Sequence, residues 1–156
     1  PGLPADLQAV LPYASLNPIQ ATAPGAALPP PFQTWSEPPN WCYYFEKADL
    51  ARQTGAWDTV AAFADRAFNV GYPDADSKHV SEYEVFIEGY ARTNQWEKAW
   101  TLSMEAVEID PLMAPMICDV WERSTPGTPT STGKTKALES IRTALECKAL
   151  EADNGG

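Results

Sequence analysis

The side chains that most often carry out chemistry are few and scattered in this chain of 156 residues. His79 is the single histidine and follows a turn with two aspartates, Asp74 and Asp76. One imidazole does not make a zinc site or a catalytic triad, both of which need several converging groups. The two aspartates begin like a calcium loop, but the glycine required at its sixth position is missing. We expect an exposed histidine in a solvated turn, and neither a metal nor a cofactor.

A second candidate for chemistry is a phosphate-binding loop at residues 127–135, which ends in Gly133-Lys134-Thr135. Five residues separate Gly127 from Gly133, whereas such loops have four, and Thr128 follows where the spacing would require the first glycine. The loop also works only as a turn from a strand into a helix, and no strand is indicated before it. The segment therefore predicts a linker followed by the start of a helix.

Carboxylates are abundant, and two of them close together could act as acid and base in glycoside hydrolysis. The pattern favours a simpler interpretation, because Asp49 and Arg52 are spaced i,i+3 and Glu88 and Arg92 are spaced i,i+4. Such pairs on a helix surface stabilise it by roughly 0.2–0.5 kcal/mol each. We expect these to be surface ion pairs, we assign no catalytic residue, and we predict that the chain is not an enzyme.

The amino-acid composition of the chain limits the classes of partner that it can bind. The chain has 11 basic and 21 acidic residues, and the net charge of −10 disfavours nucleic acid and anionic membranes. No run of about 18 apolar residues is present, so we predict no transmembrane segment in this chain, although it could be tethered to one. A start at Pro1 without a leader suggests either a removed leader or a part of a longer protein.

Three cysteines, Cys42, Cys118 and Cys147, lack the close spacing of a metal site. One disulfide could form, but buried free thiols on helices are the favoured interpretation.

The predicted helices begin after an N-terminal stretch that is rich in proline and poor in charge. Residues 1–40 hold ten of the fifteen prolines and only two charged side chains, Asp6 and Glu37. Proline blocks helix formation, so we expect an extended Pro/Ala-rich arm. Its spaced apolar residues suggest that it lies on a surface, of its own chain or of a neighbour. The anchors we predict are Leu11, Tyr13, Phe32 and Trp35.

From residue 41 onward the pattern predicts helices with short connections, which favours antiparallel neighbours. The first should follow a cap at Asn40 and stop at Gly55, and the second should end at Gly71. The third should start at a Ser81–Glu84 capping box. The ranges expected are 41–53, 57–70, 81–93 and 95–109.

An internal repeat supports these hairpins. An offset of 39 residues superposes Gly55 on Asn94 and Trp57 on Trp96, with small residues aligned where two helices must approach closely. A period of this size indicates a helical solenoid. The other matched pairs are Tyr44 with Tyr83, Asp58 with Glu97, and Ala67 with Ala106.

The second unit resembles the tetratricopeptide repeat in the spacing of Tyr83, Tyr90, Trp96, Ala99, Ala106 and Pro111, and the first unit keeps Gly55, Trp57 and Ala67. This resemblance implies an all-α, short helical-hairpin solenoid over residues 41–124, in which the first helix of each repeat lines a concave face. The polar residues that it implies on this face are Asp49, Arg52, Gln53, Glu84, Glu88 and Arg92.

Beyond residue 111 we expect one more helix at 112–123, a Ser/Thr/Pro/Gly linker at 125–133, and a C-terminal capping helix with a frayed tail at 134–156. The last helix should run from about 136 to 150. Its apolar stripe consists of Leu138, Ile141, Leu145 and Ala149.

Seventeen aromatic residues could form a carbohydrate or peptide platform, but a core of this size needs most of them. We assign six to helix packing: Trp57, Trp96, Tyr44, Tyr83, Phe86 and Tyr90. For four others the core is favoured, and their exposure would indicate a contact surface: Trp35, Tyr43, Trp100 and Trp121.

A further resemblance concerns Trp41–Gln53 and Phe86–Ala91, which, behind a Pro-rich arm, look like the C-terminal extramembrane part of bacterial multi-spanning, glycosyltransferase-like proteins. It implies a bacterial protein at the cell surface or elsewhere outside the cytoplasm.

Three functions remain open. The leading one is a non-catalytic scaffold whose concave face grips an extended segment, from another protein or from its own arm. The alternatives are a subunit that assembles into a filament or ring through the arm, and an accessory domain of a glycosyltransferase-like membrane protein.

Overall fold

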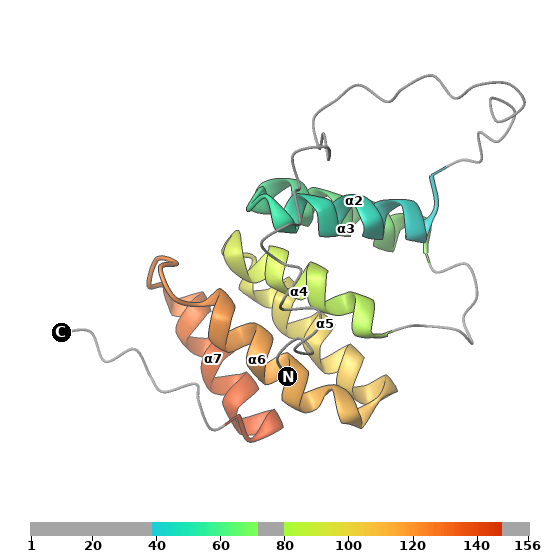
Figure 1. The fold of residues 1–156 in the computed structure, drawn as a ribbon. Coiled ribbons are helices and arrows are strands. Elements are labelled where there is room, and N and C mark those ends of the chain that lie inside the picture. The colour runs from blue at the N-terminus through green and yellow to red at the C-terminus, as the bar shows by residue number, and fades with distance from the viewer. Residues whose placement is uncertain (1–38, 72–79, 148–156) are drawn as a thin grey trace, which may run out of the picture. The chain divides into compact units, whose positions relative to one another are not determined.

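A computed structural model describes residues 39–71 and 80–147 of the chain. Within these two ranges the chain forms α-helices and short 3-10 turns and no strand, which confirms the all-α prediction (Figure 1). Three groups of predictions lie outside the described residues. They concern the arm with Leu11, Tyr13, Phe32 and Trp35, the turn with Asp74, Asp76 and His79, and the tail after residue 147.

The first hairpin consists of α2 (Trp41–Gln53) and α3 (Trp57–Val70). The predicted cap is present, because the Asn40 side chain accepts a hydrogen bond of 3.1 Å from the Tyr43 amide. Gly55 has a φ of +70°, the left-handed conformation in which glycine has no steric penalty, and it makes the turn between the two helices. Both helices have the ranges expected from the sequence.

The second hairpin consists of α4 (Tyr83–Arg92) and α5 (Trp96–Ile109). Asn94 has a φ of +61°, so the residue 39 positions after Gly55 adopts the same left-handed turn. The predicted capping box is wrong. Ser81 lies inside the 3-10 turn η4 (Val80–Glu82), and α4 begins two residues later without a side-chain hydrogen bond from its N-cap residue Glu82.

The third hairpin consists of α6 (Ala114–Ser124), which follows the 3-10 turn η5 (Pro111–Met113), and α7 (Thr132–Leu145). The expected start of the last helix near residue 136 is wrong. Ser131 accepts a hydrogen bond of 3.1 Å from the Lys134 amide and so caps a helix that begins four residues earlier. The helix also ends earlier, at Leu145, because Glu146 is left-handed with a φ of +54°.

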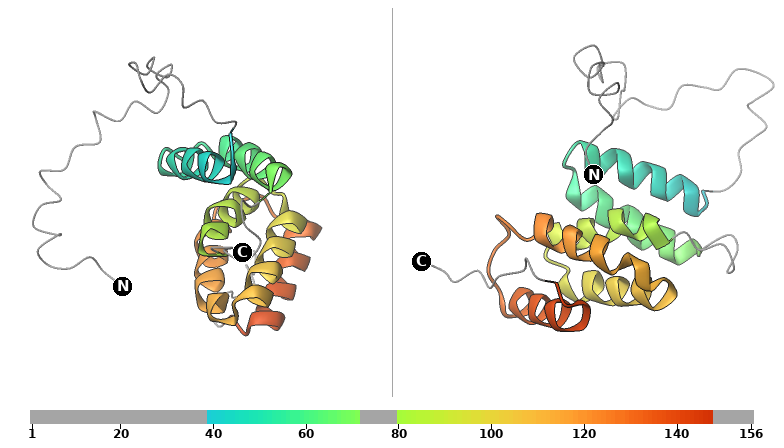
Figure 2. Two further views of the ribbon diagram at one scale, coloured as in Figure 1. Left: turned by 90° about the vertical axis from the view of Figure 1, so that its right-hand side faces the viewer. Right: turned by 60° about the horizontal axis from the view of Figure 1, so that its bottom comes forward.

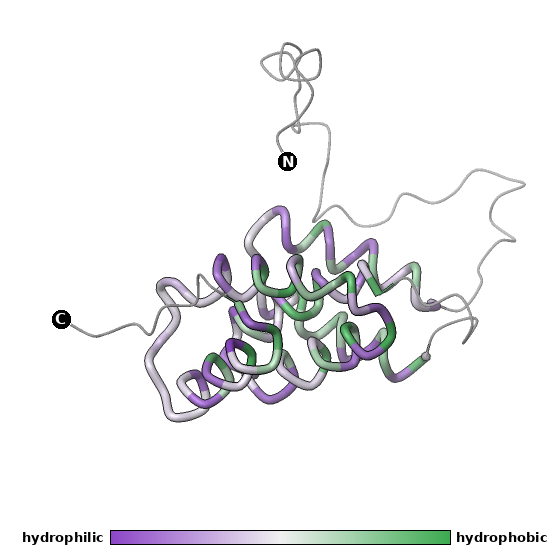
Figure 3. Tube along the Cα trace, turned by 90° about the horizontal axis from the view of Figure 1, so that it is seen from below, coloured by the Kyte–Doolittle hydropathy of each residue, from purple (hydrophilic) through white to green (hydrophobic). Residues whose placement is uncertain are grey.

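Helix α4 is the centre of the packing. It contacts α2, α3, α5 and α6, while α7 packs against α5 and α6 (Figure 2). The backbones of α3 and α4 approach closely at Gly89, where an added Cβ would lie 2.5 Å from Cγ1 of Val60. Hydrophilic and hydrophobic residues alternate along the helices, as expected for elements with one buried face (Figure 3).

The aromatic predictions are partly confirmed. Trp96, Tyr83, Phe86 and Tyr90 are buried, and the half-buried Trp57 and Tyr44 pack against the core. Trp41, which the sequence analysis left unassigned, is 1% exposed and lies 5.0 Å from the ring centroid of Phe68. Trp121 is fully buried, as favoured. The core assignment is wrong for Tyr43 and Trp100, which are 46% and 38% exposed.

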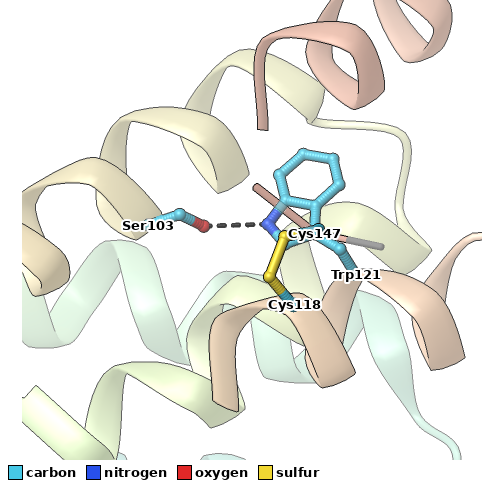
Figure 4. Close-up of a disulfide and its surroundings, with 4 residues drawn as sticks. All are labelled: Ser103, Cys118, Trp121 and Cys147. Atoms are coloured by element: carbon cyan, nitrogen blue, oxygen red, sulfur yellow. Dashed lines mark hydrogen bonds between the residues drawn. A yellow bond between two sulfur atoms is a disulfide. The ribbon is translucent and has the colours of Figure 1, made fainter. Parts of the chain in front are cut away.

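The cysteine interpretation is also wrong. Cys118 on α6 and Cys147 after α7 form a disulfide, and Cys42 is free and exposed. The bridge lies beside Trp121, whose indole donates a hydrogen bond of 2.9 Å to the Ser103 hydroxyl (Figure 4). The sequence could not indicate this pairing, because the two cysteines are 29 residues apart and are brought together only when α7 folds back onto α6.

Candidate functional site

The six polar residues predicted for a concave face do come together. Asp49, Arg52 and Gln53 lie on α2, and Glu84, Glu88 and Arg92 lie on α4. Helix α6 adds Arg123. These seven residues are here called the charge cluster, and they come from the first helix of each of the three hairpins.

Glu88 is the buried centre of the charge cluster, with a side chain that is 5% exposed. Its carboxylate accepts a hydrogen bond of 3.2 Å from Nε of Arg123, and it lies 3.7 Å from Arg92 and 3.9 Å from Arg52. The predicted pair of Glu88 with Arg92 is present, but its placement on the surface is wrong, because the carboxylate is buried. Burial of an anion requires compensating charges and hydrogen bonds, and three guanidinium groups supply them here.

Arg123 is the member that sequence reasoning missed. Its guanidinium binds Glu84 as well as Glu88, so it connects α6 to two successive turns of α4. The repeat match ended before α6, and no local spacing relates residue 123 to residues 84 and 88. A basic residue in the last turn of a predicted helix was the only available signal.

Arg92 joins the charge cluster to α3. Its guanidinium lies 5.2 Å from the centroid of the Trp57 ring, and it donates a hydrogen bond to the backbone carbonyl of Arg123. Nε of Arg92 is buried and has no hydrogen-bond partner among the described residues. The half-buried Trp57 thus packs against a cation in addition to the apolar core.

The α2 edge of the charge cluster is accessible, as is Arg123 on α6, whose side chain is 37% exposed. Asp49 accepts hydrogen bonds of 2.9 Å from both Arg52 and Gln53. The side chain of Arg52 is 33% exposed, and Gln53 is an exposed residue. The ionised members are three arginines and three carboxylates, so the charge cluster is neutral as a unit in a chain of net charge −10.

A second polar group links α3, α4 and α5. Asp65 on α3 accepts hydrogen bonds of 2.7 Å from Tyr90 on α4 and from Lys98 on α5. Burial by itself would raise the pKa of Asp65, but the hydrogen bonds from Lys98 and Tyr90 and the charge of Lys98 outweigh it and hold the pKa below the ordinary value of an aspartate. Burial, together with the hydrogen bond to Asp65, raises the pKa of the Tyr90 hydroxyl well above its ordinary value.

Lys134, from the segment that does not qualify as a phosphate-binding loop, makes contacts within the fold. Lys134 is 4% exposed, and its ammonium group donates hydrogen bonds of 3.1 Å to the carbonyls of Thr125 and Thr128. This places a cation at the C-terminal end of α6, where the helix dipole favours it. The lysine is thus engaged by the loop between α6 and α7.

Residues 39–71 and 80–147 contain no group of three or more histidine, cysteine or acidic residues arranged to hold a metal ion. None of their helices combines the length and apolar character needed to cross a bilayer.

Comparison of the chain with protein-family models, with curated proteins and with solved structures finds no match.

Proposed function

We propose that the chain is a non-catalytic binding domain, a short tetratricopeptide-like solenoid whose α2, α4 and α6 face holds an extended segment of a partner protein. Three consecutive hairpins and the 39-residue correspondence of Gly55 with Asn94 and of Trp57 with Trp96 support the solenoid. In such a solenoid the first helices share one face, and α4 contacts both α2 and α6.

The observation that carries the proposal is the charge cluster itself. Its residues, from the first helix of each of the three hairpins, form one polar surface. Glu88 holds the arginines of this surface in fixed positions. Arg52, Gln53 and Glu84 are accessible beside this buried centre. Fixed donors and acceptors lower the entropy cost of binding a peptide backbone, because their side chains are already ordered.

The proposal can be tested with a random peptide library displayed on phage and the purified chain as bait. The variant Arg52→Ala/Gln53→Ala removes accessible donors and leaves Glu88 in place. The control Arg142→Ala/Asn69→Ala removes an exposed arginine and an exposed amide on α7 and α3. We expect selected peptides to bind the first variant at least tenfold more weakly and the control with unchanged affinity.

Equal affinities of the two variants for every selected peptide would contradict the proposed face. Glu88 is unsuitable for this test, since its replacement would disturb the fold along with the surface. Thermal melting of both variants provides the check that the fold is retained.

The disulfide supports a related proposal about location. We infer that the domain works in an oxidising compartment, because disulfides persist outside the reducing cytoplasm. Cells can be quenched in acid, the protein alkylated under denaturing conditions, and its mass measured. One alkylated cysteine per chain is expected, whereas three would contradict the inference.

A further inference from the structure

A groove between α5 and α7 lies on helices that do not contribute to the charge cluster. It has a volume of about 360 Å³ and is lined on α5 by Trp96, Glu97 and Trp100. On α7 its lining includes Gly133, Lys136 and Ala137. The two helices pack against each other, so the groove is formed by elements that also build the core.

One residue that lines this groove, Trp96, has a hydrogen-bond donor that the fold leaves unused. Trp96 is 5% exposed, and its indole Nε1 is buried without an acceptor among the described residues. Cδ1 of the same ring, which is bonded to Nε1, lies 3.4 Å from the position that a Cβ of Gly133 would occupy. The N–H edge of Trp96 therefore lies near Gly133, which also lines the groove. A buried donor without a partner is destabilising, and an incoming acceptor recovers that lost hydrogen bond.

The wall of the groove presents an aromatic surface. Trp100 lies one helical turn beyond Trp96 and is 38% exposed. An exposed indole in a groove offers apolar area with little conformational entropy to lose on binding.

The charges of the residues that line the groove further limit the class of ligand that fits. Glu97 and Lys136 cancel, so the groove is neutral although the chain carries a net charge of −10. The groove therefore has no net charge that would favour a ligand of either sign. The ligand that fits is uncharged, has apolar rings for Trp100, and has free carbonyl groups for Nε1 of Trp96.

Proline-rich protein segments have this chemistry. A polyproline II helix makes no internal hydrogen bonds, so its carbonyls are free, and proline has no amide donor that burial would leave unpaired. Grooves lined by aromatic residues are a recurrent binding mode for such segments. We propose that the α5/α7 groove binds a proline-rich segment of a partner protein, with Trp96 donating to a backbone carbonyl and Trp100 packing on a proline ring.

The test is titration of the full chain with synthetic decaproline and with a Gly-Ser peptide of equal length, followed by calorimetry. We expect saturable binding of decaproline only. Trp100→Ala should weaken it at least tenfold, whereas Tyr43→Ala, which removes a similarly exposed aromatic residue from α2, should leave it unchanged. Gly133→Leu, which adds a side chain to the lining of the groove, should also weaken it.

The role of the indole N–H has its own test. Trp96→Phe retains an aromatic ring without the donor and should weaken decaproline binding about tenfold. In the unsubstituted chain, the indole N–H resonance of Trp96 should shift on titration. An unmoved Trp96 resonance at saturation would overturn the assigned hydrogen bond.

Three results would overturn the proposal as a whole. They are an absence of saturable decaproline binding, equal affinities of the Trp100→Ala and Tyr43→Ala variants, and binding of cellotriose in place of decaproline, which would assign the groove to saccharides. The Arg52→Ala/Gln53→Ala variant should bind decaproline normally, so the groove and the charge cluster succeed or fail independently.

Discussion

The ion pairs and hydrogen bonds of single charged residues in this chain are determined by partners on other segments. Glu88 has a sequence neighbour for an ion pair in Arg92, yet its shortest contact with a guanidinium is to Arg123, 35 residues later. Lys134 and Asp65 behave similarly, since each is held by groups from another segment. Substitutions of these charged residues therefore test contacts between segments. Their effects on stability do not follow from pairs within a single helix.

Replacement of Glu88 by alanine should destabilise the fold by about 3 kcal/mol, because it leaves three arginines facing a buried site without their anion. Urea unfolding followed by circular dichroism measures this change. Glu84→Ala is the matched control on the same helix, and its half-buried side chain should cost below about 1 kcal/mol. Similar losses for the two variants would show that Glu88 is not the centre of the charge cluster.

The lowered pKa of Asp65 predicts a pH dependence of stability. The carboxylate is stabilised in the folded state, so its contribution is present in full above the unfolded pKa of about 3.9 and is lost as pH falls through the lower folded value. The difference in unfolding free energy between the unsubstituted chain and Asp65→Asn should therefore shrink below about pH 4. It should stay below about 1 kcal/mol, because Asp65 and Lys98 are about half exposed.

Lys98→Met provides the control for this titration. It removes the partner that contributes most to the lowered pKa, so the pH-dependent difference caused by Asp65→Asn should be smaller in that background. An unchanged difference would assign the effect to other groups.

At the scale of elements, close helix contacts explain where small residues occur. Ala48, Ala64, Ala67, Ala99 and Ala106 are all 0% exposed, and Gly89 is buried against α3. The turn residues Gly55 and Asn94 are equally specific, since both hairpins need a left-handed residue between their helices. Helix lengths and turns thus follow local rules, while the spacing between helices depends on these small side chains.

Gly89→Ala should destabilise the domain by about 1–3 kcal/mol even though alanine is the better helix former. The added Cβ would lie 2.5 Å from Cγ1 and 3.0 Å from Cβ of Val60. Gly133→Ala is the control, because its Cβ would meet Trp96 at an ordinary 3.4 Å, and it should be neutral or stabilising. In a Val60→Ala background the cost of Gly89→Ala should decrease; an unchanged cost in this double-mutant cycle would exclude the clash as the cause.

The disulfide should stabilise the end of α7. Closing a loop of 29 residues is worth about 3.5 kcal/mol by the chain-entropy relation, so Cys118→Ser/Cys147→Ser should lower the unfolding free energy by up to that amount. Cys42→Ser should have no effect, because Cys42 is free and exposed. Loss of stability in the Cys42 variant alone would contradict the pairing.

At the scale of the whole described body, α4 connects the other elements. Eight of its ten residues are buried, and it contacts both helices of the first hairpin and one helix of each later hairpin. Helix α7 lies at the other extreme, since it contacts only α5 and α6 among the helices with substantial packing. Cooperative unfolding should therefore begin away from α4.

Native-state hydrogen exchange measured by mass spectrometry can check this order. Amides of α4 should exchange most slowly, and reduction of the disulfide should accelerate exchange in α7 before it affects α4. Uniform acceleration in all helices after reduction would show that the disulfide supports the entire fold.

Local patterns in the sequence were sufficient for the helices of the first hairpin and, apart from the start of α4, for those of the second. Asn40, Gly55 and Gly71 act within a few residues of the backbone they cap or terminate, and the 39-residue repeat relates one hairpin to the next. The resemblance to the tetratricopeptide repeat implied six of the seven residues of the charge cluster, and Arg123 was missed because the repeat match ended before α6.

The contacts between segments that are far apart in the sequence were determined only by the tertiary structure. The bond from Arg123 to Glu88, the Cys118–Cys147 disulfide and the unused indole N–H of Trp96 each depend on how α6 and α7 fold back on α4 and α5. The exposure of Trp100 and the burial of Trp121 depend on the same packing. Helix periodicity determines which residues share a face, but whether a second helix covers that face depends on packing between segments far apart in the chain.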